Sequence, residues 1–397
     1  MSFNIANTGL NAITEQLNAI SNNIANSGTV GYKSMRAEFA AMYADSQAMG
    51  VGVSNVSQSI SRGGSLMAGS SNLDLAISGN GFFTVRDNEG NTVYTRAGYF
   101  GTDNDGFLTN NLGMKLQGYP VDANGVLQVG TISDLQIKSG SIPAKATDSL
   151  DFVANIDARA TLPERADFDP EDPKSYNNTY TTQVYDSLGR EHSLSQYFVK
   201  KEDNTWEVYY YLDGNALNKD APTQMTFTSQ GVLQEPADKV NLTADIGGAA
   251  GLNIALDYSG TSQYGSEFSV TKNNASGYAA GEKNGEQIDE DGSVYATYSN
   301  GQRMLQGQLV LANFTNPNGL ASSNGTSWTA TTASGTALLA APGSGLSGTI
   351  QSGALEGSNV DLSGELVGLM TAQRNYQANT KIISTNDSMM NALFQAL

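Results

Sequence analysis

The sequence contains no cysteine among its 397 residues. Disulfide bonds, thiolate catalysis and cysteine-ligated metal sites are therefore excluded. It also contains a single histidine, His192, in a strand-like stretch between Glu191 and Ser193. One histidine cannot form a histidine-rich zinc site, and nothing around it suggests a catalytic triad. We expect His192 to be a surface or edge-strand residue, and we expect neither a metal nor a cofactor.

Long apolar runs are missing as well. No stretch of about 18 apolar residues occurs, so we expect no transmembrane helix. Residues 1–4 show neither the positive region nor the long apolar region of a secretory signal. We therefore expect the protein to stay in the cytoplasm or to leave the cell by a route that cleaves no signal.

Recognisable catalytic motifs are also absent. The string Gly79-Asn80-Gly81 begins like a dinucleotide fingerprint, but Thr84 replaces the third glycine and a strand-like stretch follows. The acidic turns 103–106 and 289–292 do not fit the EF-hand spacing, since Leu112 stands where the first turn would need its bidentate Glu. We expect ordinary hairpin turns at both places and no enzymatic activity.

Positive charge is scarce. The chain has 21 Lys and Arg residues against 39 Asp and Glu residues, giving a formal net charge of −18. The terminal segments 1–70 and 353–397 are nearly neutral, so the acidity is concentrated between them. An acidic body lacks the basic stripe that nucleic acids require. Nearly neutral ends can pack closely against copies of themselves while the acidic body keeps the protein soluble.

Two long apolar stripes mark the ends of the chain. The spacing of each stripe keeps one narrow face turned toward a partner helix, and such a face is too narrow to fold a helix alone. We expect both stripes to form a self-assembly interface with other copies of the chain, although packing within one monomer is the open alternative. The N-terminal stripe consists of Phe3, Ala6, Leu10, Ile13, Leu17, Ile20 and Ile24. The C-terminal stripe consists of Leu362, Leu369, Tyr376, Ile383, Met390 and Leu397, supported by Leu366 and Phe394.

The stripes predict two helices. The first is expected from Asn4 to Asn26 with Ser2 as its cap, and the second from behind Asp361, its N-cap, to Leu397. Asparagine, a weak helix former, fills the polar positions of the first helix. Three inner heptad positions of the second are polar, which weakens that stripe in an isolated helix: Gln373, Thr380 and Asp387.

The sequence between the helices is typical of short strands and tight turns. Residues 82–86 and 92–95 predict a hairpin around an Asn/Gly turn. Residues 309–314 form an apolar run that predicts one fully buried strand. We therefore predict a mainly β, multidomain body of nested β domains, with N- and C-terminal α-helices that form a coiled-coil inner domain. Further strands are expected at 180–185, 194–200, 206–212, 225–227 and 294–298.

Several strings in order along the chain resemble the bacterial flagellar rod and hook proteins, a family of axial proteins. The large insert 146–274 resembles the outer domain of the hook members of this family, and 307–314 supports that resemblance. The family strings are 22–33, 73–83, 95–100, 116–120, 353–362 and 372–379. The motif within the first of them consists of Asn22, Asn23, Ile24, Ala25, Asn26, Gly31, Tyr32 and Lys33.

The resemblance implies four domains. It implies a coiled-coil inner domain (1–28 and 362–397), a linking region (29–70 and 353–361), an inner β domain (71–145 and 275–352) and an outer β domain (146–274). The glycines of the linking region are expected to give it backbone freedom for bending. These are Gly28, Gly31, Gly50, Gly52, Gly63 and Gly64.

The function that the resemblance implies is structural. We expect a flagellar hook subunit that polymerises into a flexible tube, transmits motor torque to the filament, and lies outside the cell. The implied partners are copies of the chain, the distal rod, hook cap, hook–filament junction and hook-length control proteins, and the type III export apparatus. Export would occur without a cleaved signal. A distal rod subunit, a secreted β-sandwich adhesin or glycan-binding module, and a cell-wall enzyme are the alternatives.

Overall fold

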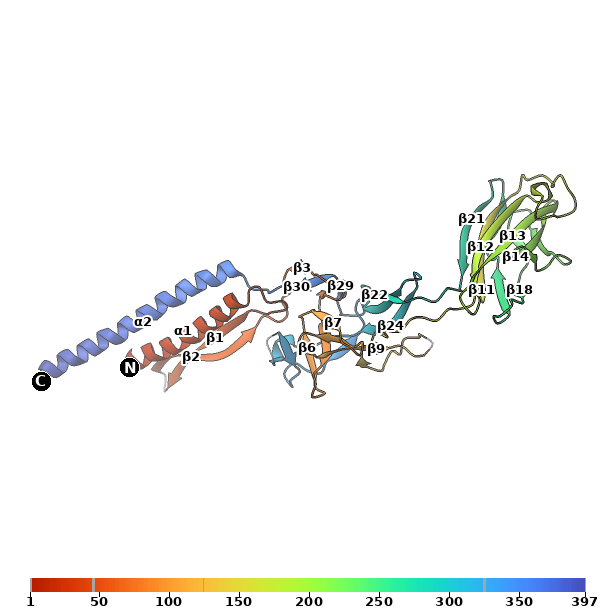
Figure 1. Ribbon diagram of the computed structural model, residues 1–397. Coiled ribbons are helices and arrows are strands. Elements are labelled where there is room, and N and C mark those ends of the chain that lie inside the picture. Colours follow the sequence, from red (N-terminus) through yellow and green to blue (C-terminus); the bar gives the residue numbers. More distant parts are fainter. Residues whose placement is uncertain (1, 45–46, 124, 324–325, 397) are drawn as a thin grey trace. The chain divides into compact units, whose positions relative to one another are not determined.

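The computed structural model describes residues 2–44, 47–123, 125–323 and 326–396. Two compact units make up the protein. Unit 1 contains Met1–Ser139, Gly285–Thr297 and Arg303–Leu397, and unit 2 contains Gly140–Asn284 and Tyr298–Gln302. The chain is mainly β between one helix at each end, which confirms the predicted fold class at this level (Figure 1).

The terminal helices are α1 (Ser2–Ala25) and α2 (Leu362–Ala396). Ser2 lies in α1, so the prediction that it caps the helix from outside is wrong. The start of α2 directly after Asp361 agrees with the prediction, and the Asp361 carbonyl accepts a hydrogen bond from the Glu365 amide at 2.9 Å. Leu397, the predicted end of this helix, lies outside the described residues.

A β-hairpin follows α1 where the sequence indicated only a linking region. Its strands β1 (Met35–Ala44) and β2 (Gln47–Gln58) pair antiparallel, and the pairing shifts register at 38/39 and at 42/43. These irregularities interrupt the alternation of apolar and polar residues by which a strand is recognised in a sequence. The hairpin packs along α1, so this part of the linking region is regular structure.

Gly50 explains how closely the hairpin approaches α1. Its φ is +112°, and a Cβ atom at this position would collide with the Thr8 hydroxyl. The residue is therefore glycine because of close packing and a left-handed backbone, and the expectation that it supplies bending freedom is wrong.

The body of unit 1 is built on a 13-stranded sheet and two small strand pairs. The predicted hairpin is confirmed: β5 (Phe82–Arg86) pairs antiparallel with β6 (Thr92–Thr95), with Val85 opposite Val93. On one side of this hairpin, β5 is followed by β9 (Lys115–Pro120), β24 (Arg303–Leu309), β23 (Ser293–Tyr298) and β22 (Lys283–Ile288). On the other side, β6 is followed by β27 (Ser327–Thr329) and β26 (Ala321–Ser322). The branches are β7 (Phe100–Thr102), β8 (Leu108–Asn110), β10 (Ser133–Asp134), β25 (Leu311–Asn313) and β28 (Leu338–Ala340). The pairs are β3 (Leu66–Ala68) with β30 (Ala354–Glu356) and β4 (Leu75–Ser78) with β29 (Thr349–Ser352).

Aromatic side chains fill the core of this body. Phe82 lies edge-on to Phe314 and to Trp328, with ring centroids 5.9 Å apart in both pairs. Trp328 donates its indole N–H to Gln58 Oε1 at 2.7 Å, which attaches the end of β2 to the core. The predicted buried run at 309–314 is largely buried, but the prediction of a single strand is wrong. Leu309 ends β24 opposite Gly118, whereas Leu311 begins β25 opposite Phe83, because the chain changes partners between them.

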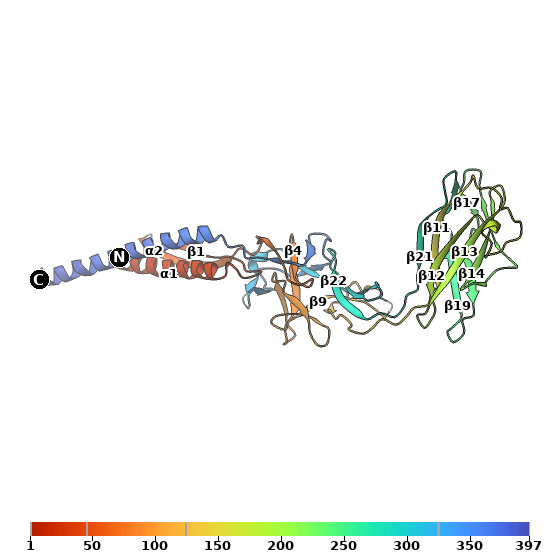
Figure 2. The same cartoon turned by 45° about the horizontal axis from the view of Figure 1, so that its top comes forward.

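Unit 2 is a sandwich of two sheets, which Figure 2 shows with β12, β13 and β14 side by side. Its core is apolar and contains Phe152, Phe198 and Trp206, all fully buried. One sheet contains β12 (Asn178–Tyr185), β13 (Glu191–Glu202), β14 (Thr205–Leu212), β15 (Asn215–Ala216), β16 (Thr223–Phe227) and β17 (Leu233–Glu235). The other contains β11 (Ser149–Asp157), β18 (Val240–Ala244), β19 (Leu252–Asp257), β20 (Ser262–Tyr264) and β21 (Ser269–Ala275). A short 3-10 helix, η1 (Pro173–Ser175), precedes β12, and η2 (Pro317–Gly319) lies in unit 1.

His192 is half-buried, and the expectation of an edge strand is wrong. It lies on β13, which pairs with β12 on one side and β14 on the other, and only 12% of its side chain is exposed. Both ring nitrogens face carboxylates.

The close approach at Gly50 gives a first prediction. Replacing Gly50 with alanine should loosen the hairpin from α1, because the new methyl group meets Thr8 in a strained backbone. Amide hydrogen exchange of residues 3–25 should become faster in that variant. Gly52→Ala is the matched control, since its methyl group would meet only the flexible Met42 side chain, at 3.0 Å. Equal protection of α1 in both variants would contradict this assignment.

Candidate functional site: a polar junction and an exposed helical face

The apolar stripe of α1 is largely covered within the chain. Ala6, Ile13 and Ile20 are buried, and Leu10 and Leu17 are half-buried. Most of this stripe packs in one cluster with α2: Ile13, Leu17, Ile20 and Ile24 of α1 with Leu369 and Ala372 of α2. Of the predicted stripe only Phe3 is exposed. The expectation that this stripe stays uncovered in a lone copy is therefore wrong for α1.

The face that α2 turns toward α1 is small and polar. A Cβ atom on Gly368 would lie 3.4 Å from the Ile20 side chain, and one on Gly9 of α1 would lie 3.1 Å from the Asn379 amide oxygen. Ala372 is fully buried between these points. Small residues on both helices therefore bring the two helices close together, and Leu369 is the one member of the predicted C-terminal stripe in the cluster with α1.

The predicted C-terminal stripe lies mostly in solvent. The exposed fractions are 45% for Leu362, 46% for Leu366, 41% for Tyr376 and 49% for Met390. Leu369 and Ile383 are half-buried. The side chain of Phe394 and the whole of Leu397 lie outside the described residues. An apolar stripe at heptad spacing thus remains available along a 35-residue helix.

A buried carboxylate joins this helical region to the β body. Glu356 Oε1 lies 2.6 Å from Lys33 Nζ and accepts the Gly64 amide at 2.9 Å, while Oε2 lies 2.9 Å from Arg96 Nη1. All three charged side chains are buried. Burial would raise the pKa of Glu356, but Arg96 and Lys33 hold it below the ordinary value. The carboxylate therefore stays charged and holds two cations from distant parts of the chain.

Asn359 connects the segments that enter and leave the helical region. Its Oδ1 accepts the Ser34 amide at 2.7 Å, and its Nδ2 donates to the carbonyls of Ser59 at 3.0 Å and Arg62 at 2.9 Å. The Arg62 guanidinium in turn donates to the Asn359 carbonyl at 2.7 Å. One buried amide side chain therefore fixes three backbone segments.

Asn23 plays the same part at the end of α1. Its Oδ1 accepts the Met35 amide at 2.8 Å and the Tyr32 hydroxyl at 3.2 Å. Its Nδ2 donates to the Met35 carbonyl and to Glu365 Oε1 of α2, both at 2.8 Å. Asn23 thus ties α1, the first strand of the hairpin and the first turn of α2 together.

Three of the family strings meet at this junction. Asn23, Gly31, Tyr32 and Lys33 come from 22–33, Arg96 from 95–100, and Glu356 and Asn359 from 353–362. Gly31 has a φ of +72°, and a Cβ atom there would collide with the backbone at Ala97. The other motif residues lie outside the contacts just described; Asn22 and Ala25 are exposed, and Ile24 and Asn26 are half-buried.

These strings are recognisable in the sequence, but the sequence alone does not predict that they meet. Sequence periodicity identifies apolar faces, whereas the partners of a buried charge are set by tertiary contacts. The one available signal was Glu356, an acid directly after the apolar Ala354-Leu355 in an otherwise nearly neutral end of the chain.

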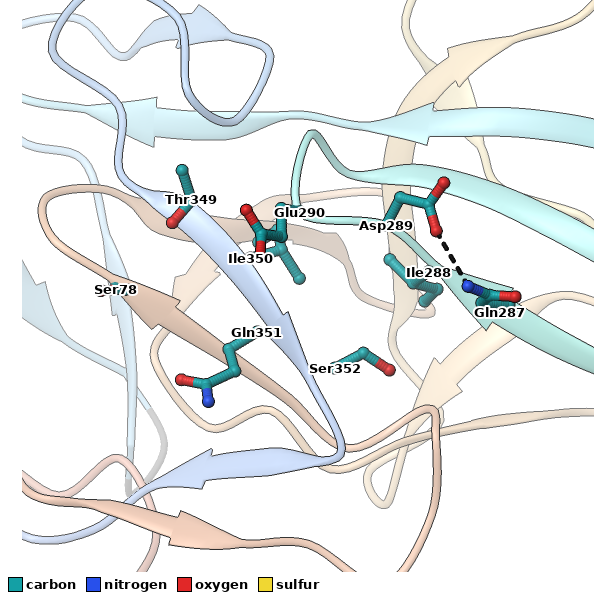
Figure 3. Close-up of a pocket in the computed structure, with 9 residues that line it drawn as sticks. All are labelled: Ser78, Gln287, Ile288, Asp289, Glu290, Thr349, Ile350, Gln351 and Ser352. Carbon is teal, nitrogen blue, oxygen red and sulfur yellow. Dashed lines mark hydrogen bonds between the residues drawn. The ribbon is translucent and has the colours of Figure 1, made fainter.

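A polar cavity of about 640 Å³ lies in the β body, between β29 and the end of β22 (Figure 3). Asp289 lies at the wall of the cavity. It accepts a hydrogen bond from Gln287 at 3.1 Å and forms an ion pair with Arg303 at 2.8 Å. The cavity is also lined by Glu290 and by the hydroxyls of Thr349 and Ser352. No three His, Asp or Glu side chains of the described segments are grouped to hold a metal ion.

Family models match along most of the chain. They are described as "Flagella basal body rod protein" (3–33), "Flagellar hook protein FlgE/F/G D1 domain" (76–152), "Flagellar basal body protein FlaE D2 domain" (155–278) and "Flagellar basal body rod FlgEFG protein C-terminal" (351–396). These matches define a flagellar axial protein of the rod and hook class.

Full-length relatives identify the branch of this class. The flagellar hook protein FlgE of Salmonella typhimurium is 40% identical over 402 residues, covering 99% of both chains. That of Escherichia coli K12 is 40% identical over 400 residues with the same coverage. The chain therefore belongs to the flagellar hook protein FlgE family.

A solved structure agrees on the fold. The crystal structure of Helicobacter pylori flagellar hook protein FlgE2 matches with a TM-score of 0.53 at 16% identity, covering 72% of this chain and 99% of that one.

The junction gives a second prediction. Glu356→Gln should destabilise unit 1 by about 3–5 kcal/mol, because it leaves two buried cations without their counter-charge. Urea unfolding followed by circular dichroism measures this. Glu38→Gln is the control, since the Glu38 pair with Arg36 is exposed and its loss should leave the midpoint unchanged. A Glu356→Gln midpoint equal to that of the parent would show that the charges do not hold the junction.

Proposed function

We propose that the protein is the structural subunit of the bacterial flagellar hook. Copies of it polymerise into a flexible tube that joins the motor to the filament and transmits torque. Membership of the hook protein family supports this proposal, and the exposed apolar stripe of α2 is the observation that carries it.

An exposed apolar stripe of this kind can drive polymerisation. A head-to-tail contact whose rotation does not close produces an open helical assembly. Burying the stripe against helices of neighbouring copies would contribute about 25 cal/mol per Å² of apolar surface. Its heptad spacing fits a coiled-coil contact between copies, which makes the terminal helices an inner domain. The self-assembly interface is thus the exposed stripe of α2 together with exposed Phe3 at the start of α1.

The rest of the chain takes the other roles in this proposal. The inner domain is 1–28 and 362–397, the linking region 29–70 and 353–361, the inner β domain 71–145 and 275–352, and the outer β domain 146–274. The outer β domain is acidic, with twenty acids and nine bases. Like-charged surfaces form weak contacts that can slide or break at small cost, so the tube can bend while its inner layer remains continuous.

The proposed location is outside the cell, in the hook of the flagellum. The partners are copies of the chain and, by family membership, the distal rod, hook cap, hook–filament junction and hook-length control proteins. Passage through the type III export apparatus requires an unfolded chain, which suits a sequence without cysteine. Among the helices that the structure describes, neither has the length and hydropathy to cross a membrane.

The stripe gives a third prediction. The double variant Leu366→Asp and Tyr376→Asp should fold normally but form no tubes, because both side chains are exposed in the monomer and their charges would be buried in the polymer. Electron microscopy and sedimentation of concentrated protein measure this. Substitutions at Leu17 or Ile20 would be less informative, since those side chains pack within the chain.

Val367→Asp is the matched control, because Val367 is 59% exposed on α2 but lies outside the heptad stripe. It should polymerise. Normal tubes from the double variant, or equal loss in the control, would refute the stripe as the interface.

The entry to unit 2 gives a fourth prediction. Lys145 and Tyr278 exchange two backbone hydrogen bonds of 3.0 Å, so residues 146–277 can be replaced by a short Asn-Gly turn. The shortened protein should still form tubes, because α2 and the junction are intact, but the tubes should bend differently. Curvature fluctuations in electron micrographs measure this. A folded shortened protein that forms no tubes would show that the outer domain is essential for assembly.

A further inference from the structure

His192 bridges two turns at one end of unit 2. Its Nδ1 lies 2.6 Å from Asp213 Oδ2, and its Nε2 lies 3.3 Å from Asp186 Oδ2. Asp186 is fully buried and begins the turn between β12 and β13. Asp213 is partly exposed and begins the turn between β14 and β15, where its φ of +49° is rare for a residue other than glycine.

The first of these turns packs against the chain segments that enter and leave unit 2. A Cβ atom on Gly189 would lie 2.7 Å from the Ala144 side chain and 3.4 Å from Ala279. The adjoining strand end is held in the same way, since Tyr185 accepts the Thr147 amide on its carbonyl at 2.9 Å and donates its own amide to the Thr147 hydroxyl at 2.8 Å. The turn therefore forms the base on which the entry and exit segments lie.

The bridge requires a protonated imidazole. A carboxylate only accepts hydrogen bonds, so two carboxylates on one ring need both ring nitrogens to donate. Neutral imidazole carries one N–H, and its other nitrogen then turns a lone pair toward a carboxylate oxygen. Loss of the proton therefore replaces one attraction by a repulsion. The longer contact, from Nε2 to Asp186, is the one that should break.

The two carboxylates that face the ring act in the same direction. Asp186 also accepts the Arg190 guanidinium Nε at 2.6 Å, and its pKa is held far below the ordinary value by its hydrogen bonds, despite burial. Although partial burial acts the other way, hydrogen bonds from the Ser193 amide and from His192 hold the pKa of Asp213 below its ordinary value, so both carboxylates stay ionised. The hydrogen bond to Asp213, and then that to Asp186, raise the pKa of His192, against the opposing effect of burial. Glu191 is bonded to the Tyr185 hydroxyl at 3.4 Å.

We propose that His192 is a protonation-controlled latch that holds the turn at Asp186–Arg190 to the turn at Asp213, and thereby fixes the entry and exit segments of unit 2. Protonated, it clamps the two turns together. Neutral, it releases the Asp186 turn, and the segments at 142–145 and 278–281 loosen. This inference does not depend on polymerisation.

The direction of the pH effect follows from linkage. A histidine with a raised pKa contributes stability that is fully present below its unfolded value of 6.5 and is lost as pH rises through the folded pKa. Histidine is the one side chain whose ordinary pKa lies between pH 5 and 8, and the sequence has only one. A reversible loosening as pH rises above 6.5 can therefore be assigned to one side chain.

Hydrogen exchange with mass spectrometry on the full chain tests the latch. After correction for the intrinsic pH dependence of exchange, raising the pH from 5.5 to 9.5 should speed exchange at 142–145, 186–190 and 278–281. The expected increase is roughly tenfold, as for the loss of one charge-assisted hydrogen bond. Exchange in β11 and β14 should change little. The NMR titration of the single imidazole should have its midpoint in the same pH range.

Two variants complete the test. His192→Gln should exchange rapidly in these segments at both pH values, and Glu191→Gln should keep the response of the parent. An unchanged parent overturns the latch, as does an equal change throughout the sandwich, which would indicate global destabilisation. A pH response that persists in His192→Gln also overturns it. If His192→Gln does not fold, the pH dependence of hydrogen exchange in the parent protein is sufficient to support or overturn the latch.

Discussion

Everything at the helical end of the protein depends on the ion pairs of Glu356. A buried carboxylate is costly unless its partners are in place, so the Lys33 and Arg96 side chains must arrive together from segments 63 residues apart. That requirement favours the arrangement of the helix end, the hairpin and the β body in which both cations reach Glu356. Asn23 and Asn359 then satisfy the backbone groups that this arrangement buries. The polar junction thus specifies geometry, whereas apolar packing alone would tolerate several arrangements.

The junction also determines which helical surface is left for other molecules. By setting the start of α2 beside Asn23, it places the small face of α2, with Gly368 and Ala372, against the apolar stripe of α1. One stripe is then used within the chain and the other is left exposed. Two stripes that are alike in sequence are therefore buried to different extents, and the hydrogen bond from Asn23 to Glu365 is one of the contacts that orient the helices.

Sequence patterns predicted the parts of the fold that depend on local chemistry. Both helices follow from periodicity, and the hairpin at 82–95 follows from its turn residues. The strands at 35–58 were missed because two register shifts disturb their alternation. The run at 309–314 was read as one strand because burial looks the same on either side of a change of partner. For the site, the apolar stripes were visible in the sequence, but their unequal burial was not. The contact of His192 with Asp213 and the partners of Glu356 depend on residues more than 20 positions away, which periodicity does not report.

At two places, the junction and the base of unit 2, an outgoing segment of the chain lies beside a returning one. The two places are built in the same way, which is relevant to how the subunit carries torque. At the junction, the outgoing Gly31 amide binds the returning Glu356 carbonyl at 2.7 Å. At the base of unit 2, outgoing Ile142 and Lys145 pair with returning Gly281 and Tyr278. In each place an outgoing and a returning segment are tied by backbone hydrogen bonds, and a tied pair resists twisting far more than a single strand does. Each of the two places is thereby braced within its own unit. The nested order of the domains makes these hydrogen bonds possible, because the chain passes each connection once on its way out and once on its way back.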